Sequence, residues 1–276
     1  MEIQPDIARL PCKKSMHWIL QHDIFSEAAS KVLVETLERF GLPHSFHKVV
    51  PFVGELLPDP DIGHNNVICI GSYSMRHVAR KRGWSPGVFD LAEQDFRQQM
   101  RHWGGRMLNA GSVVSRFGDA VFTGEALFVR PCNDTKYFAG RVFSREEFTA
   151  WQRSVCALGL DDESSLTPDT LIQLARPLEI YAEYRYWVVR GRIVTSSLYK
   201  RGDKVIYSGD VAPRIDAYVM ECLEEWMPHE AFVIDVCDTP EGIRIVEINT
   251  LNASGFYAGD MQRLVLALEE AYDTQS

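Results

Sequence analysis

A carboxylate and an amide follow the apolar residues of a strand near the C-terminus. The segment reads EGIRIVEINTLNASGFY, and side chains two apart in a strand point to the same side. Glu247 and Asn249 are therefore expected on the face that Ile243 and Ile245 begin. Buried polar groups in a strand need hydrogen-bond or ionic partners, so this end of the strand is a candidate binding site.

The preceding apolar segment, AFVIDVC, adds a second carboxylate, Asp235. We expect the two segments to form a hairpin through the loop DTPEG, with Cys237 opposite Ile243 and Asp235 diagonally across from Glu247, about 7 Å or less between Cβ atoms. Two carboxylates this close repel each other unless a proton or a cation lies between them, and oxygen ligands favour Mg²⁺ or Mn²⁺. The spacing thus predicts a metal site at Asp235, Glu247 and Asn249; the alternatives are a solvated sheet face or pairing with Arg or Lys.

The N-terminal part of the chain is predicted to form a small open α/β sheet. HWIL and SFHKVV read as strands around a helix, SEAASKVLVETLERFG, with Ser26 as its N-cap and Gly41 just past its end. A further strand, NNVICIG, leads into Gly71, Ser72 and a helix through Arg82. A Gly-Ser turn can hold a phosphate, but the remaining glycines of a dinucleotide or P-loop fingerprint are absent, which favours a simple tight turn.

The rest of the chain reads as antiparallel strands and helices. SVVSRFGDAVFTGEALFVRPCNDTKYFAGRVFS alternates apolar and polar residues, and Ser144 with Glu147 forms a capping box for a helix to about Leu158. LEIYAEYRYWVV and RIVTSSLYK indicate a hairpin around Arg190 and Gly191. RIDAYVMECLEEWM and DMQRLVLALEEAY have the periodicity of amphipathic helices.

Composition excludes several classes of protein. A chain of 276 residues with 46% hydrophobic residues can bury one large or two small cores. The net charge of -9 argues against non-specific nucleic-acid binding, although a local basic pocket could still hold a phosphate. No segment approaches the roughly 20 apolar residues of a membrane span, and the first residues lack the pattern of a signal peptide, so we expect a cytoplasmic protein without a membrane partner. The six cysteines have no metal-type spacing, and His44 with His47 is read as a loop or strand surface in preference to a metal site.

The block FVIDVCDTPEGIRIVEINTLNASGFY resembles the C-terminal signature of the ATP-grasp superfamily, in which these strands bind the magnesium that accompanies ATP. Upstream, ALFVRP resembles the vvKP strand whose cation meets the ATP phosphates, and LEIYAEYRYWVVRGRIV resembles the hinge and the following hairpin. SLYKR falls where a basic residue reaches the terminal phosphate. The chain from Arg106 onward is similar to a compact clade of ATP-grasp proteins related to the RimK ligases.

The resemblance implies an α/β (α+β) fold in which two α+β lobes clamp ATP behind a small open α/β pre-ATP-grasp domain. We expect the pre-ATP-grasp domain in residues 1–105 and the ATP-grasp domain in residues 106–276. Within the latter, residues 106–180 would form the N-terminal lobe and residues 181–276 the C-terminal lobe.

The resemblance also assigns roles to residues. Arg130 and Lys136 would contact the ATP phosphates, and Asn252 with Ser254 would line the phosphate or acceptor end. Surface ion pairs are the alternative for both cations. The adenine and ribose would be held by a set of hinge and strand residues: Leu178, Glu179, Ile180 and Glu183. The two glutamates could instead be exposed strand carboxylates.

Three further cations, Arg185, Lys200 and Arg201, are candidates for binding the transferring phosphate or an acceptor carboxylate. The implied activity is that of an ATP-dependent carboxylate-amine ligase, which forms an amide or peptide bond through an acylphosphate and releases ADP and phosphate. Its cofactors would be ATP and Mg²⁺ or Mn²⁺, its substrates small-molecule, peptide or protein carboxylates and amines, and its catalytic residues Arg130, Arg185 and Arg201.

Two departures from the family pattern keep an alternative open. The usual lysine is replaced by Arg130, and the glycine-rich phosphate loop by CNDTK. The alternative is a non-catalytic or regulatory ATP-binding module derived from an ATP-grasp ligase.

Overall fold

Of the 276 residues, the computed structural model describes 16–22, 28–51, 53–91, 95–133, 138–158 and 166–272. The chain divides into two compact units, one of Met1–Val88 with Met261–Ser276 and one of Phe89–Asp260. The mixture of helices and strands confirms the predicted α/β class. No helix in the described residues is long and apolar enough to cross a membrane.

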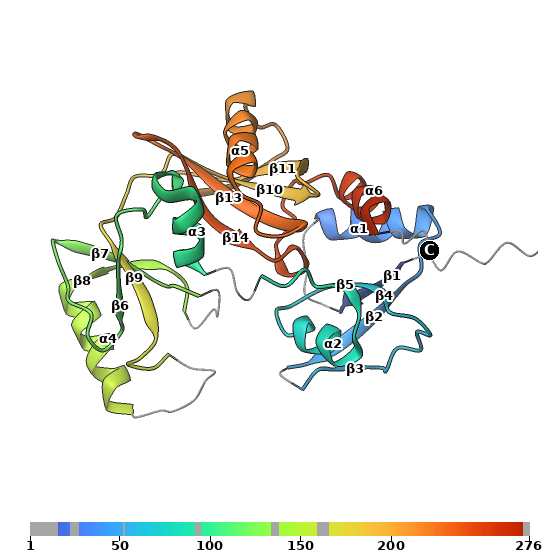
Figure 1. Ribbon diagram of the computed structural model, residues 1–276, viewed down its shortest axis with the longest axis horizontal. Helices are drawn as coiled ribbons and strands as arrows, with labels where there is room; N and C mark the ends of the chain where they lie inside the picture. The colour runs from blue at the N-terminus through green and yellow to red at the C-terminus, as the bar shows by residue number, and fades with distance from the viewer. Residues whose placement is uncertain are drawn as a thin grey trace, which may run out of the picture. The chain divides into compact units, whose positions relative to one another are not determined.

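Five strands form the open sheet of the first unit: β1 (His17–Gln21), β2 (His44–Val50), β3 (Glu55–Leu57), β4 (Asn66–Ile70) and β5 (Ser85–Gly87). Their order is β3-β2-β1-β4-β5 (Figure 1). Strand β1 is parallel to β2 and β4, and β4 is parallel to β5, whereas β3 is antiparallel to β2. The predicted N-terminal α/β sheet is therefore present in this unit.

Helices α1 (Ala28–Arg39), α2 (Met75–Arg82) and α6 (Met261–Tyr272) belong to the same unit. Helix α1 buries Leu33 and Leu37, four residues apart, and packs against α6. Residues 1–105 and 106–276 remain the predicted domains, whereas the compact units have other bounds, since α6 joins the first unit.

The turn after β4 is shaped by a neighbouring glutamine. The N–H of Ser72 donates to Oε1 of Gln21 at 2.8 Å, and a Cβ on Gly71 would lie 2.7 Å from the Cβ of Gln21. Glycine is therefore required by close packing at this position. This contact supports the tight-turn interpretation of Gly71 and Ser72.

The second unit contains two sheets. The four-stranded sheet has the order β6-β9-β7-β8, and α4 (Arg145–Leu158) lies beside it (Figure 1). Its strands are β6 (Val113–Arg116), β7 (Ala126–Pro131), β8 (Arg141–Ser144) and β9 (Leu171–Ala175). The capping box is confirmed at the start of α4, where the Ser144 N–H donates to the Glu147 carboxylate at 2.8 Å and the Glu147 N–H donates to Ser144 Oγ at 3.3 Å.

The five-stranded sheet has the order β12-β11-β10-β13-β14. Its strands are β10 (Ala182–Val189), β11 (Arg192–Arg201), β12 (Lys204–Ser208), β13 (Ala231–Thr239) and β14 (Gly242–Asn249). Helices α3 (Phe96–Trp103) and α5 (Pro213–Glu225) contribute to the core of this sheet, and the short helices η1 (Gly104–Arg106) and η2 (Leu251–Ala253) flank it in the chain. Tyr186, Ile234 and Ile215 are fully buried in this core.

Side-chain alternation gives this sheet two different faces. On β10 and β13, Tyr184, Tyr186, Ile234 and Val236 enter the apolar core. Arg185 lies between the two tyrosines, so its side chain points to the opposite face. One face of the sheet therefore builds the core, and the other carries charged groups.

Candidate functional site

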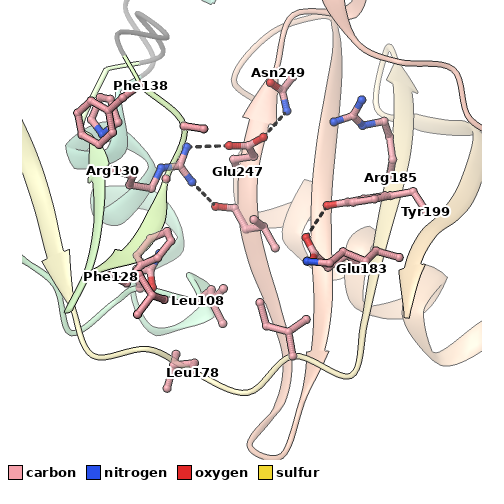
Figure 2. Close-up of a pocket in the computed structure, with 18 of the residues that line it drawn as sticks. Leu108, Phe128, Arg130, Phe138, Leu178, Glu183, Arg185, Tyr199, Glu247 and Asn249 are labelled. Carbon is pink, nitrogen blue, oxygen red and sulfur yellow. Dashed lines mark hydrogen bonds and ion pairs between the residues drawn. The ribbon is translucent and has the colours of Figure 1, made fainter. Parts of the chain in front are cut away.

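A cavity of about 770 Å³ is lined by residues of both sheets of the second unit. Strand β7 contributes Phe128 and Arg130, and the five-stranded sheet contributes Glu183, Arg185 and Glu247 (Figure 2). Strand alternation explains this placement, because residues two apart on β7 and on β10 share a face. The cavity is therefore lined by the charged face of the five-stranded sheet.

Three charged residues form a row across neighbouring strands. Arg185 is the direct partner of Asp235, and Asp235 is the direct partner of Glu247. Nε and Nη2 of Arg185 donate to Oδ1 and Oδ2 of Asp235 at 2.8 and 2.7 Å. Because both oxygens accept N–H donors, this geometry is that of an ionised carboxylate.

The observed register corrects the sequence prediction. Cys237 pairs with Arg244, and Ile243 pairs with Asp238, so the expected pairing of Cys237 with Ile243 is wrong. A β-bulge follows, since Val236 faces Ile245 while Asp235 faces Glu247. The hairpin turn is shorter than expected, and the bulge adds one residue to β14, so the two acids meet directly.

The bulge also changes which face Glu247 occupies. Ile245 lies in the apolar core, whereas Glu247 and Asn249 line the cavity. The expectation that all of them share one face is therefore wrong. The extra residue Val246 shifts the alternation by one position, so that the polar end of β14 leaves the core.

Asn249 contacts both acids. Its Nδ2 donates to Glu247 Oε1 at 3.0 Å and lies 3.4 Å from Asp235 Oδ2. The structure thus brings together all three predicted metal ligands. If the amide turned over, its oxygen would face the same point, which suits a hard dication. In the described residues, no group of three or more His, Cys, Asp or Glu side chains is arranged for a metal ion, so a metal here would rely on two carboxylates and an amide.

Arg130 reaches Glu247 from the other sheet. Its Nη2 donates to Glu247 Oε2 at 2.7 Å, and its Nη1 donates to the Val246 carbonyl at 3.3 Å (Figure 2). The residue that the sequence assigns to ATP phosphates therefore pairs with a predicted metal ligand.

Burial and charge act in opposite directions on the two acids. Burial raises the pKa of Asp235, and the pair with Arg185 opposes that shift. Burial also acts to raise the pKa of Glu247, but the charge of Arg130 and the hydrogen bond from Asn249 outweigh it and lower that pKa. Glu247 is therefore held as a carboxylate at neutral pH.

Glu183 accepts two further hydrogen bonds in the cavity. Its Oε1 accepts from Lys200 Nζ at 2.9 Å, and its Oε2 accepts from the Tyr199 hydroxyl at 2.8 Å. Burial, followed by the charges of Asp235 and Glu183, raises the pKa of Tyr199, so the hydroxyl remains a donor. A register shift between β10 and β11 brings Tyr199 and Lys200, neighbours in sequence, to the same carboxylate.

One end of the cavity is apolar. Leu108, Phe128, Leu178 and Ile180 line it, and Figure 2 shows Leu108 and Phe128 near Leu178. Two of these residues, Leu178 and Ile180, are predicted nucleotide contacts. Glu179 instead lines an adjoining cavity of about 240 Å³.

The remaining predicted site residues are distributed differently. Ser254 lines the cavity, whereas Asn252 is buried and is not part of its lining. Arg201 is exposed at the end of β11, away from the lining. Lys136 lies outside the described residues.

Sequence reasoning missed an aromatic wall of the cavity. The Tyr257 ring lies between those of Tyr199 and Tyr207, each 5.0 Å away between centroids. The Arg185 guanidinium lies 4.8 Å from the Tyr257 ring centroid. Tyr257 has a backbone φ of 52°, which is uncommon for a tyrosine. Its position shortly after the EIN strand was the available signal.

Two lobes of strands and helices around one cavity, with the Asp-Glu-Asn set on its wall, define an ATP-grasp fold. Solved structures confirm this fold: a RimK-domain ATP-grasp protein from Sphaerobacter thermophilus matches with a TM-score of 0.58 at 12% identity, covering 93% of this chain and 96% of that chain. D-alanine–D-alanine ligase from Bacillus anthracis complexed with ATP matches with a TM-score of 0.56 at 9% identity, covering 94% of this chain and 97% of that chain. The ATP-grasp ligase PsnB, complexed with minimal precursor, Mg and ADP, matches with a TM-score of 0.52 at 10% identity, covering 94% of this chain and 98% of that chain.

The chain belongs to an ATP-grasp domain family, the third family of its clade, whose model matches residues 62–268. The predicted ATP-grasp membership is confirmed. The search of curated proteins returned no match.

Proposed function

We propose that this protein is an ATP-dependent carboxylate-amine ligase that acts through an acylphosphate and releases ADP and phosphate. The observation that carries the proposal is the gathering of Asp235, Glu247 and Asn249 beside Arg130 and Arg185 at one cavity of an ATP-grasp fold. Oxygen ligands and guanidinium groups together suit a metal-bound polyphosphate.

The cavity has a suitable place for each part of a nucleotide. The apolar end, with Phe128, Leu178 and Ile180, would enclose the adenine. Glu183, held by Lys200 and Tyr199, would accept the ribose hydroxyls. Arg130 would donate to the phosphates, because a guanidinium matches phosphate oxygens in a planar fork.

The donor set fits Mg²⁺ or Mn²⁺, which when bound would neutralise phosphate charge. Glu247 and Asn249 line the cavity and would hold the metal with Asp235, which is 1% exposed. Arg185 fixes the orientation of Asp235 through its two hydrogen bonds. A preorganised carboxylate loses little entropy when it binds a ligand.

The reaction requires positioning and charge neutralisation. A substrate carboxylate would attack the γ-phosphate, and ADP would leave; an amine would then displace the phosphate from the acylphosphate. Arg130 would balance the charge that moves to the leaving phosphate oxygens. Ser254 and Gly255, which line the cavity near Arg185, would face the acceptor.

A screen of amino acids and peptides for acceptor-stimulated phosphate release from ATP tests the proposal. The ligase predicts that phosphate release depends on both a carboxylate and an amine. Tight ATP binding without release for any pair would instead support the non-catalytic nucleotide-binding module.

A further inference from the structure

Each predicted metal-binding acid already has its own cation. Arg130 pairs with Glu247 at 2.7 Å, and Arg185 pairs with Asp235 at 2.7 Å. Two guanidinium charges therefore match two carboxylate charges. A third pair, Lys200 with Glu183 at 2.9 Å, follows the same pattern in the same cavity.

The two arginines are held very differently. Arg185 makes two hydrogen bonds to Asp235 and a third, at 3.2 Å, to the Gly255 carbonyl, and its side chain is 8% exposed. Arg130 donates once to Glu247 and once, at 3.3 Å, to a carbonyl, and its side chain is 21% exposed. Arg130 is thus the cation that can leave its acid at lower cost.

We propose that Arg130 makes this site selective for a metal-nucleotide complex over a free divalent cation. The inference rests on the proposed nucleotide site. Without nucleotide, Arg130 occupies Oε2 of Glu247 and repels a dication at that carboxylate. The phosphates of a nucleotide offer Arg130 other acceptors, so Glu247 becomes free for the metal that arrives with them.

Charge balance makes the preference reciprocal. A free dication would add two positive charges to a compensated group of four residues, and a metal-free nucleotide would bring its phosphates toward Glu247 and Asp235. Either ligand alone is therefore disfavoured. By linkage, nucleotide raises metal affinity by the same factor by which metal raises nucleotide affinity.

The test measures Mn²⁺ binding by the loss of the free-ion electron paramagnetic resonance signal, with and without a non-hydrolysable ATP analogue. Wild-type protein should bind Mn²⁺ weakly alone and at least about tenfold more tightly with the analogue. Arg130→Met should bind Mn²⁺ alone about tenfold more tightly than wild type, since Glu247 loses its competing cation.

Two variants separate charge from structural damage. Arg130→Lys keeps the positive charge and should keep the weak binding of free Mn²⁺. Arg116→Met is the matched control, because Arg116 also lies in the four-stranded sheet and pairs with an acid, Asp169, on the exposed surface. Its Mn²⁺ affinity should equal that of wild type.

The outcomes distinguish this inference from the proposed function. If wild type binds Mn²⁺ with the analogue but Arg130→Met leaves free Mn²⁺ affinity unchanged, the role of Arg130 is wrong and the nucleotide site stands. Tight binding of free Mn²⁺ by wild type also overturns it. If wild type binds neither the analogue nor Mn²⁺ in its presence, the proposed function itself is wrong.

Discussion

Arg185 and Asp235 face each other on β10 and β13 and share two hydrogen bonds of 2.8 and 2.7 Å. Both are almost completely buried, at 7% and 1% exposure. Asp235 in turn faces Glu247, which Arg130 pairs from another sheet. The acid pair therefore has a fixed cation on one side and a more loosely held cation on the other.

Removing the fixed cation should destabilise the fold. Arg185→Met leaves Asp235 buried without a counter-ion, and we expect a loss of about 3 to 5 kcal/mol in the free energy of unfolding, measured by urea titration. Arg214→Met is the control, since Arg214 pairs with Asp238 on the same strand but is 57% exposed. Its loss should be about 1 kcal/mol or less. Equal losses in the two variants would contradict the structural role of Arg185.

Glu247→Gln should separate ligand binding from folding. Acid repulsion alone would leave the melting temperature unchanged or slightly raised, but the ion pair with Arg130 reverses that expectation. We predict a loss of about 1 kcal/mol or less without ligand, because this pair is partly exposed. The rise in melting temperature given by ATP with magnesium should disappear. A variant that keeps the full ligand-induced rise would show that Glu247 does not bind the metal.

Gly71→Ala should destabilise the first unit by about 1 to 3 kcal/mol, because its Cβ would lie 2.7 Å from the Cβ of Gln21. Gly63→Ala is the control, since no atom lies within 4 Å of an added Cβ there. Its free energy of unfolding should change by about 0.5 kcal/mol or less. Denaturant titrations of both variants make the comparison. A phosphate-binding role for Gly71 would be favoured if Gly71→Ala left stability intact and weakened nucleotide binding.

Stability should fall as pH drops below about 6.5. Burial, followed by the charges of His64, His47 and His44, lowers the pKa of His17. The unfolded chain then binds this proton more readily than the folded chain, so stability is lost as pH falls from 6.5 through the lowered pKa. Urea titrations between pH 7.5 and 5.5 should show a shallower fall for His17→Gln than for wild type. Identical pH dependence in both proteins would rule out this contribution of His17.

Local signals in the sequence predicted the elements well, because caps and strand alternation act over a few residues. The capping box of Ser144 and Glu147 is an example. The register of β13 and β14 was wrong, since the short turn and the bulge at Val246 depend on how the whole hairpin packs. The gathering of Asp235, Glu247 and Asn249 was still found, because both errors leave the acids on neighbouring strands.

Long-range pairs escaped the sequence analysis. Arg130 and Glu247 are 117 residues apart, and their contact depends on the placement of two sheets. The wall formed by Tyr199, Tyr207 and Tyr257 has the same origin, because its rings come from two strands and a loop. The resemblance to ATP-grasp proteins indicated Arg130 as a phosphate contact, but not its partner without nucleotide.

The products of ATP turnover test the central claim most directly. Acylphosphate chemistry breaks the bond between the β- and γ-phosphates, so wild-type protein with magnesium and an active acceptor pair should yield ADP and phosphate in equal amounts, resolved by phosphorus nuclear magnetic resonance. Glu247→Gln should yield neither above the rate without enzyme. Formation of AMP and pyrophosphate by the wild-type protein would contradict the proposed ligase mechanism.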